Sequence, residues 1–126
     1  VYPEKKILAV CGDGGFMMNC QEFETALRVK APFVTLIFND SSYGLIKWKQ
    51  MDQYGKSCCV DFTNPDFVKF AESMGAIGYR ITKAEELVPT LEEAFEQNVP
   101  VIIDCPVDYA ENTKLTAHLK ELMEKL

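Results

Sequence analysis

The sequence lacks the patterns that would place it in several large classes of protein. Its five cysteines form no Cys-x-x-Cys pair and no spacing typical of metal ligands, and it has a single histidine, His118. An odd number of cysteines without a recognisable signal peptide indicates reduced thiols and a cytoplasmic location. No apolar run approaches the roughly 20 residues of a membrane-spanning helix. The net charge of −6 argues against a nucleic-acid interface, which would be basic.

What the sequence does contain is typical of one globular domain. It has 126 residues, of which 48% are hydrophobic and 25% are charged. It shows no internal repeat, no low-complexity segment and no change of composition that would mark a domain boundary. It begins at Val1 without an initiator methionine, and we expect it to be part of a longer polypeptide.

Short apolar runs alternate with segments of helical character along the chain. The runs predict four strands, the first two of them buried, over residues 6–11, 33–38, 76–81 and 99–105. Alternation of this kind is typical of a parallel sheet. The expected fold class is therefore α/β, a three-layer doubly wound parallel sheet with helices on both faces.

Helices are predicted between and after these strands. Asn19 opens the first, with Glu22 three residues later as in a capping box. Asn64-Pro65 opens another, with a cap residue before a proline in the first helical position. Pro89 would kink a third helix or make it start later in the sequence. The helix that begins at Asn64-Pro65 is expected to end at Gly75. A short helix is predicted over 43–53, with Leu45, Ile46, Trp48 and Met51 on one side, and a loop over 54–62 follows it. Two further helices are predicted, one over 83–97 capped by Thr82 and a tail helix over 111–126.

Two carboxylates follow neighbouring strands. Gly12-Asp13-Gly14-Gly15 is expected to form a turn after the first strand, and Asn39-Asp40-Ser41-Ser42 follows the second, with 26 residues between the two aspartates. In a parallel sheet these strand ends share one edge, where open α/β sheets bind ligands. Mg²⁺ takes about six oxygen ligands and usually shares them with substrate phosphates. The pattern therefore predicts a Mg²⁺ site, with the N–H groups of Gly14 and Gly15 facing a diphosphate.

This pattern resembles the cofactor motif of thiamine diphosphate-dependent enzymes, which is Gly-Asp-Gly followed by paired asparagines. The resemblance extends over nearly the whole chain, and within the family it is closest to catabolic acetolactate synthases. It is carried by the stretches GDGGF, EFETA, LIFNDSSY, VDF, KFAESMGA and PVIIDCPVDYAENTKLT. Asp40 stands where most members have the second asparagine. The aspartate retains an oxygen ligand and adds negative charge.

The resemblance implies a set of site residues. The Mg²⁺ ligands would be Asp13, Asp40 and the main-chain oxygen of Ser42. The cofactor-binding residues would be Gly12, Asp13, Gly14, Gly15, Asp40, Ser42 and Tyr43. In the family, the glutamate that activates the cofactor lies on a separate pyrimidine-binding domain, usually of the other subunit. No catalytic residue is therefore assigned in this chain, and the isolated chain is expected to be inactive.

The resemblance also implies a parent protein. Residues 1–126 would be the diphosphate-binding domain in the C-terminal part of an acetolactate synthase, a homodimer or homotetramer. That enzyme condenses two molecules of pyruvate, a 2-oxo acid, to 2-acetolactate with release of CO₂. Ile46 stands where pyruvate decarboxylases have a catalytic glutamate, which argues against that activity.

Several alternatives remain open. One is another thiamine diphosphate enzyme: a pyruvate oxidase, a sulfoacetaldehyde acetyltransferase or a biosynthetic acetohydroxyacid synthase. Lys49 stands where the last of these has a substrate-selecting tryptophan, although Trp48 is adjacent. A receiver-like signalling module also gathers aspartates at strand ends, and Asp104 could serve there, but no lysine is suitably placed after residues 76–81. A non-catalytic Mg²⁺-binding or oligomerisation module is the last alternative.

Overall fold

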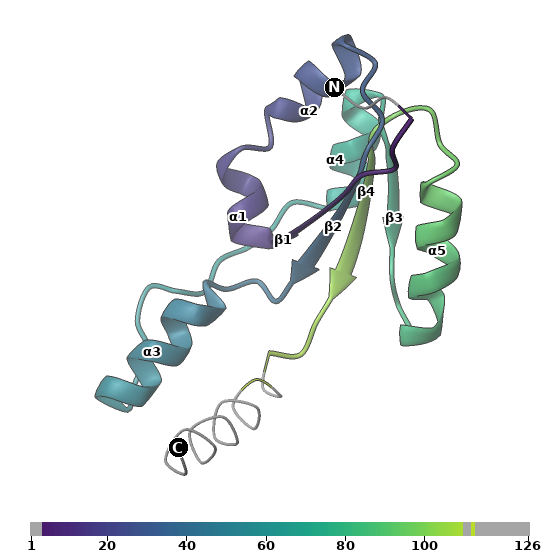
Figure 1. Ribbon diagram of the computed structural model, residues 1–126. Helices are drawn as coiled ribbons and strands as arrows, with labels where there is room; N and C mark the ends of the chain where they lie inside the picture. Colours follow the sequence, from purple (N-terminus) through teal and green to yellow (C-terminus); the bar gives the residue numbers. More distant parts are fainter. Residues whose placement is uncertain (1–3, 110–111, 113–126) are drawn as a thin grey trace, which may run out of the picture.

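A four-stranded parallel sheet forms the centre of the computed structural model, which describes residues 4–109 and 112 (Figure 1). The strands are β1 (Leu8–Gly12), β2 (Val34–Asn39), β3 (Ile77–Arg80) and β4 (Val101–Pro106), in the spatial order β1-β2-β4-β3. All three pairings are parallel. The helical segments are α1 (Asp13–Met18), α2 (Glu22–Arg28), α3 (Gly44–Tyr54), α4 (Phe67–Met74), the 3₁₀ helix η1 (Ala84–Glu86) and α5 (Leu87–Ala94).

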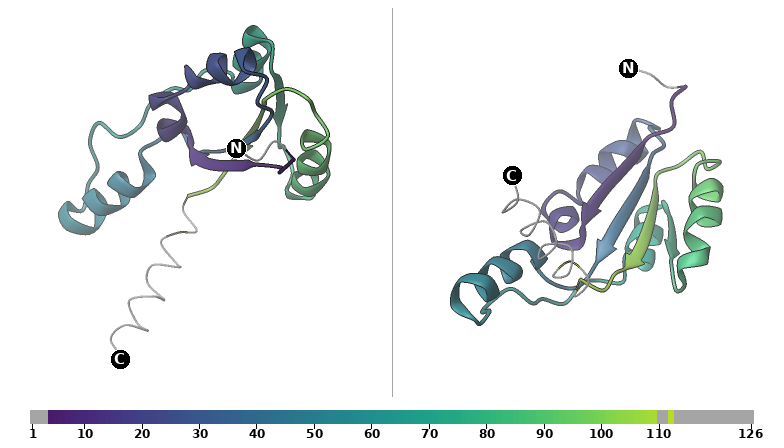
Figure 2. Two further views of the ribbon diagram at one scale, coloured as in Figure 1. Left: turned by 45° about the horizontal axis from the view of Figure 1, so that its top comes forward. Right: turned by 60° about the horizontal axis from the view of Figure 1, so that its bottom comes forward.

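Helices cover both faces of the sheet, as the sequence predicted. Successive side chains of a strand point to opposite faces, so β2 and β4 contribute to two separate cores. On one face Ile37 and Ile102 pack with buried residues of α1, α2 and α4: Phe16, Phe23, Phe67 and Ala71. On the other face Leu36 and Ile103 pack with Ala94 of α5. Figure 2 shows α1 and α2 on the opposite side of the sheet from α5. The α/β fold class is thereby confirmed.

The strand β1 is not buried, contrary to the sequence prediction. Among the described residues it pairs with β2 and has no second neighbour. Leu8 and Val10 are 41% and 54% exposed, whereas residues 34–37 of β2 are buried. An apolar run of this length looks the same in sequence whether its strand lies at the centre or at the edge of a sheet.

The Gly-Asp-Gly-Gly segment is not a turn. Gly12 ends β1 and Asp13 begins α1 at once, which corrects the expectation from the glycine content. Asn19 is the C-cap of α1, and its N–H bonds the carbonyl of Phe16, so it does not open the next helix. That helix, α2, begins at Glu22. The ring of Phe16 meets three other rings edge to face, which fixes α1 against the core.

The helix α4 begins at Phe67, not at Asn64-Pro65. Its N-cap is Asp66, whose carboxylate accepts hydrogen bonds from the N–H groups of Val68 and Lys69. Gly75 ends the helix with φ of 85°, as predicted. Because Asp66 caps the helix, the side chain of Asn64 is left for another role.

The helix predicted over 83–97 is divided into η1 and α5. The Glu86 carboxylate accepts hydrogen bonds from the Thr82 hydroxyl and from the N–H groups of Thr82 and Lys83. Pro89 is the third residue of α5, where an N–H has no intrahelical partner, and no kink is needed. The helix predicted over 111–126 lies outside the described residues.

The helix α3 extends away from the sheet (Figures 1 and 2). All of its residues are described, and none is buried. Leu45 and Ile46 are 59% and 51% exposed, so the apolar side predicted for this helix does not face the core. Within the described part of the chain, no helix has both the length and the apolar character needed to cross a bilayer.

Candidate functional site

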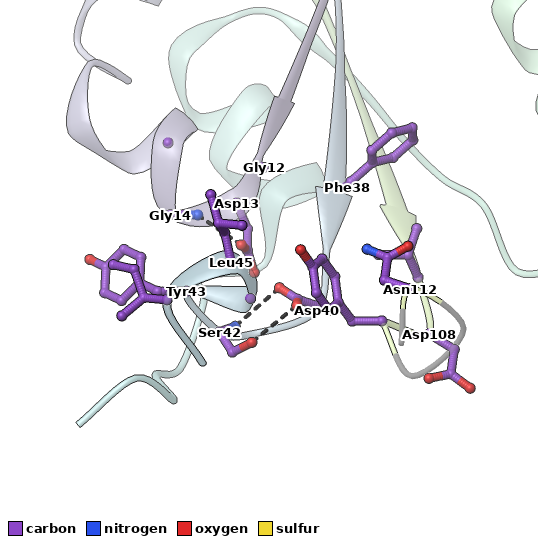
Figure 3. A pocket seen from close by; sticks show the side chains of 15 residues that line it. Gly12, Asp13, Gly14, Phe38, Asp40, Ser42, Tyr43, Leu45, Asp108 and Asn112 are labelled. Atoms are coloured by element: carbon purple, nitrogen blue, oxygen red, sulfur yellow. Dashed lines mark hydrogen bonds between the residues drawn. The ribbon is translucent and has the colours of Figure 1, made fainter. Parts of the chain in front are cut away.

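A cavity of about 620 Å³ lies at the carboxyl ends of β1 and β2 (Figure 3). Its walls come from the segments that follow these two strands, from the start of α3 and from the chain after β4. The side chains of Asp13 and Asp40 both line it, so the structure brings together the two carboxylates that the sequence placed on one sheet edge. The lining includes every residue of the expected cofactor set: Gly12, Asp13, Gly14, Gly15, Asp40, Ser42 and Tyr43.

The Asp13 carboxylate is held in one orientation at the start of α1. The residue is only 2% exposed. Its Oδ1 accepts a hydrogen bond from the N–H of Gly14 at 2.8 Å. Its Oδ2 accepts from the N–H of Ser41 at 2.8 Å and from Nδ2 of Asn64 at 2.6 Å. A buried carboxylate is tolerated when such donors replace water, and these three come from separate parts of the chain.

The Asp40 carboxylate is held by the turn that it begins. The N–H of Ser42 donates to Oδ1 at 3.2 Å, and the Ser42 hydroxyl donates to Oδ2 at 3.0 Å. Ser41 adopts a left-handed conformation with φ of 55°, which bends the chain between them.

The loop predicted over 54–62 braces this turn. The N–H of Phe62 donates to the carbonyl of Ser41 at 3.0 Å, and the N–H of Tyr43 donates to the carbonyl of Val60 at 2.8 Å. These two bonds form a short antiparallel bridge between the loop and the turn. The loop therefore helps to fix the orientation of the Asp40 carboxylate.

The glycines that line the cavity fall into two groups. A Cβ on Gly12 or Gly15 would meet no described atom within 4 Å, so another molecule can approach the backbone closely there. A Cβ on Gly14 would lie 2.7 Å from the Tyr43 ring, and one on Gly44 would lie 2.8 Å from Oδ2 of Asp40. Gly12 and Gly15 thus leave room for a ligand, and Gly14 and Gly44 permit internal packing.

The donors and acceptors fit a hard cation and an anionic ligand. Carboxylate and carbonyl oxygens are the ligands that Mg²⁺ prefers. Within the described ranges no group of three or more His, Cys, Asp or Glu side chains could hold a metal, so ligand oxygens and main-chain oxygens would complete the shell. The N–H groups of Gly14 and Tyr43 already donate to Asp13 and Val60. The N–H of Gly14, which the sequence predicted to face a diphosphate, therefore already makes a hydrogen bond within the protein.

Sequence reasoning missed the polar residues behind Asp13. Asn64 donates to Asp13 and also to Oδ1 of Asn39 at 2.9 Å. Asn39 donates to Oδ1 of Asp104 at 2.9 Å, and Arg80 donates to Oδ2 of Asp104 at 3.0 Å. The hydrogen bond to Asp104 raises the pKa of Arg80 above its ordinary value, which is already high. The presence of two cap-type residues, Asn64 and Asp66, before one helix is the signal that one of them has another role.

Two other groups near the cavity have shifted acidity. Burial raises the pKa of the Cys11 thiol, and the nearby charge of Asp13 adds to this effect. Burial likewise raises the pKa of Cys105, with a contribution from Asp104. Both thiols are therefore protonated at neutral pH and belong to the packing of the strands.

Comparisons with known proteins agree with the motif. Residues 1–105 match the family described as thiamine pyrophosphate enzyme, C-terminal TPP binding domain. An acetolactate synthase of Bacillus subtilis (strain 168) is 44% identical over 117 residues, which are 93% of this chain and 20% of that protein. The catabolic acetolactate synthase of Raoultella terrigena is 35% identical over 125 residues, 98% of this chain and 22% of that protein.

A match outside the acetolactate synthases is also found. A 3D-(3,5/4)-trihydroxycyclohexane-1,2-dione hydrolase of Halalkalibacterium halodurans is 37% identical over 112 residues, 83% of this chain and 18% of that protein. The chain thus spans about a fifth of the length of these relatives.

Proposed function

Since the chain belongs to the thiamine pyrophosphate enzyme family, as its C-terminal TPP binding domain, we propose that it holds the diphosphate of thiamine diphosphate through Mg²⁺. The observation that carries this proposal is that Asp13 and Asp40 line one cavity beside the open backbone of Gly12 and Gly15. Asp13, Asp40 and the main-chain oxygen of Ser42 would bind the cation. Two carboxylates repel a diphosphate unless a cation lies between them, so metal and cofactor should bind together.

The contribution of this chain to catalysis would be anchoring and orientation. When bound, thiamine diphosphate supplies the thiazolium carbon for decarboxylation and carbon–carbon bond formation. Asp13 and Asp40 are each held by hydrogen bonds, so they would present their oxygens to the cation without rearrangement. The Tyr43 ring packs on Phe62, with ring centroids 4.8 Å apart, and Tyr43 lines the cavity. The N–H of Gly15 would contact the diphosphate where the backbone is open.

The parent enzyme that we propose is a catabolic acetolactate synthase that condenses two pyruvate molecules to 2-acetolactate with release of CO₂. The similarity to acetolactate synthases, one of them catabolic, supports this proposal. It would be a cytoplasmic homodimer or homotetramer in which residues 1–126 form the diphosphate-binding domain. A pyrimidine-binding domain outside this chain would carry the activating glutamate, so the isolated chain should show no turnover.

A second candidate is another thiamine diphosphate enzyme. It is favoured by the similarity to the hydrolase of Halalkalibacterium halodurans, which covers most of this chain. Incubation of the full-length protein with pyruvate, Mg²⁺ and thiamine diphosphate separates the two. Formation of 2-acetolactate supports the first candidate, and its absence in a protein that binds the cofactor supports the second.

Calorimetric titration of the full-length protein with thiamine diphosphate tests the binding site. We expect binding that requires Mg²⁺ and that is abolished in Asp13→Ala, because the buried carboxylate would be the main cation ligand. Asp52→Ala is the matched control, since Asp52 is exposed on α3 and lies outside the cavity lining. Binding without metal, or full binding in Asp13→Ala, would contradict the proposal.

Substitution of Gly15 probes the open backbone separately from stability. In Gly15→Ala the new Cβ meets no described atom within 4 Å and lies in a helix, where alanine is favoured over glycine by about 0.5–1 kcal/mol. The unfolding midpoint should therefore stay the same or rise. The affinity for Mg²⁺–thiamine diphosphate should fall by about 1–3 kcal/mol, the usual cost of placing an extra methyl group where other atoms, here those of the ligand, already lie. An unchanged affinity would show that the ligand does not approach this residue.

A further inference from the structure

The Asn64 amide joins the two polar groups at the ends of β1 and β2. Its Nδ2 donates to Asp13 Oδ2 at 2.6 Å and to Asn39 Oδ1 at 2.9 Å. Both partners accept, so turning the amide over would place Oδ1 of Asn64 against two oxygens. The amide therefore has one orientation, and it uses both of its N–H bonds to hold Asp13 and Asn39.

This arrangement has a cost in stability. Oδ1 of Asn64 is buried and has no hydrogen-bond partner among the described residues. An unpaired buried acceptor destabilises a fold, because it gives up its hydrogen bonds to water without gaining others. Folds accept such conflicts chiefly at functional sites, and the N–H groups of this amide face a carboxylate that lines the cavity.

The hydrogen bonds fill one oxygen of Asp13 more than the other. In the described part of the chain Oδ2 accepts from both Ser41 and Asn64, whereas Oδ1 accepts from Gly14. A carboxylate oxygen offers about two lone-pair positions. Oδ2 is thus saturated, and Oδ1 keeps a lone pair with which to bind a cation.

An ion pair between the exposed Arg80 and the buried Asp104 holds Asn39, the partner of Asn64. Asn39 donates to Asp104, which is 2% exposed and accepts from Nε of Arg80 at 3.0 Å. The Nη2 of Arg80 donates to Asp66 at 3.0 Å, and Asp66 lies two residues after Asn64. The planar guanidinium can hold both carboxylates in fixed directions. The network therefore closes on itself and connects the carboxyl ends of β2, β3 and β4 with the start of α4.

We propose that Asn64 is a positioning residue for the metal site, and that the Arg80–Asp104 pair holds Asn39 and Asn64 in place. Asn64 directs Asp13 so that Oδ1 faces the cation and Oδ2 faces the protein. This inference rests on the proposed function of the cavity and adds to it the residues that set the geometry of the cation ligand.

The test measures metal affinity directly. Mn²⁺ replaces Mg²⁺ in the full-length protein with thiamine diphosphate present, and the free ion is measured by electron paramagnetic resonance. Asn64→Ala should weaken Mn²⁺ binding about 10–100-fold, the usual effect of losing a residue that orients a metal ligand. Asn98→Ala is the matched control, because Asn98 is exposed in the connection between α5 and β4. This variant should bind Mn²⁺ as the wild type does.

Arg80→Lys provides a second variant in case Asn64→Ala does not fold. Lysine keeps the charge but cannot donate to Asp104 and Asp66 through one planar group, so Mn²⁺ binding should weaken by a smaller factor. Thermal unfolding without metal reports the structural effect of each substitution separately. Excess Mn²⁺ should restore cofactor binding in both variants, which a purely structural defect would not allow.

The outcomes separate this inference from the proposed function. Wild-type Mn²⁺ affinity in a folded Asn64→Ala protein, or in Arg80→Lys if Asn64→Ala is unfolded, overturns the positioning role. The proposed function then still stands if Asp13→Ala abolishes Mn²⁺ binding. A wild-type protein that binds no Mn²⁺ with thiamine diphosphate overturns both.

Discussion

The helices α3 and α4 differ in what their apolar side chains do. In α4, Phe67 and Ala71 are fully buried against the sheet. The backbone of β3 comes close enough that a Cβ on Gly78 would lie 2.6 Å from the Cα of Val68. In α3 no residue is buried, although all of them are described, and Leu45 and Ile46 line the cavity. The apolar residues of α4 stabilise the fold, whereas two of those of α3 line the cavity.

The two helices also begin differently. The carboxylate of Asp66 caps α4, whereas Tyr43 precedes α3 without a side-chain hydrogen bond to the helix. The N–H of Tyr43 instead bonds the carbonyl of Val60. The start of α4 is thus stabilised locally, and the start of α3 depends on the loop that braces the Asp40 turn. The position of a helix relative to the sheet, and not its apolar content, decides which role it has.

The largest effect is expected from removing the main anchor of α4. Phe67→Ala leaves a cavity in a fully buried part of the core, and the free energy of unfolding should fall by about 3–5 kcal/mol. Urea unfolding followed by circular dichroism measures the change. A loss below 1 kcal/mol would mean that α4 contributes no more to the core than α3 does.

A smaller effect is expected from acid at the start of α4. The N–H of Lys69 lowers the pKa of Asp66, and Arg80 and Lys69 add to the shift through their charges. A lowered pKa favours the folded state when the carboxylate is ionised. The contribution is therefore present above the ordinary aspartate range and is lost as the pH falls through the lowered pKa.

Asp66→Asn isolates this charge effect, since asparagine also caps helices well. Between pH 7 and about pH 2, the wild type should lose more stability than the variant does. Parallel stability profiles for the two proteins would show that the charge of Asp66 does not stabilise α4.

The smallest effect is expected on α3. Ile46→Gln replaces a side chain that is 51% exposed, so the free energy of unfolding should change by no more than about 0.5 kcal/mol. The same urea experiment measures it beside Phe67→Ala. A loss approaching that of Phe67→Ala would contradict the division of roles between the two helices.

Much of the fold could be predicted from the sequence because the central strands are buried on both faces. Residues of β2 and β4 therefore form mostly apolar runs, interrupted by Thr35 and Asp104, which are recognisable without any partner. The meeting of Asp13 and Asp40 in one cavity followed from the same reasoning, since parallel strands place their carboxyl ends on one edge. Gly75 was recognisable as a helix end because its left-handed conformation favours glycine.

The parts that could not be predicted depend on partners distant in sequence. Asn64 and Asp66 are both good cap residues, and local rules cannot choose between them. The choice is settled by Asp13, which lies 51 positions from Asn64 in the sequence. The Arg80–Asp104 pair likewise joins two strands across the sheet. The sequence therefore indicated the carboxylates but not the residues that orient them.

The place of β1 in the sheet has a consequence for handling this chain in solution. Its outward N–H and C=O groups have no strand beside them in the part of the chain that the structure describes, and Leu8 and Val10 are exposed along the same strand. Such a border is a template for self-association, because another extended backbone can add to it. At high concentration we expect copies to aggregate side by side there, and a charged residue, as in Val10→Lys, should keep them apart.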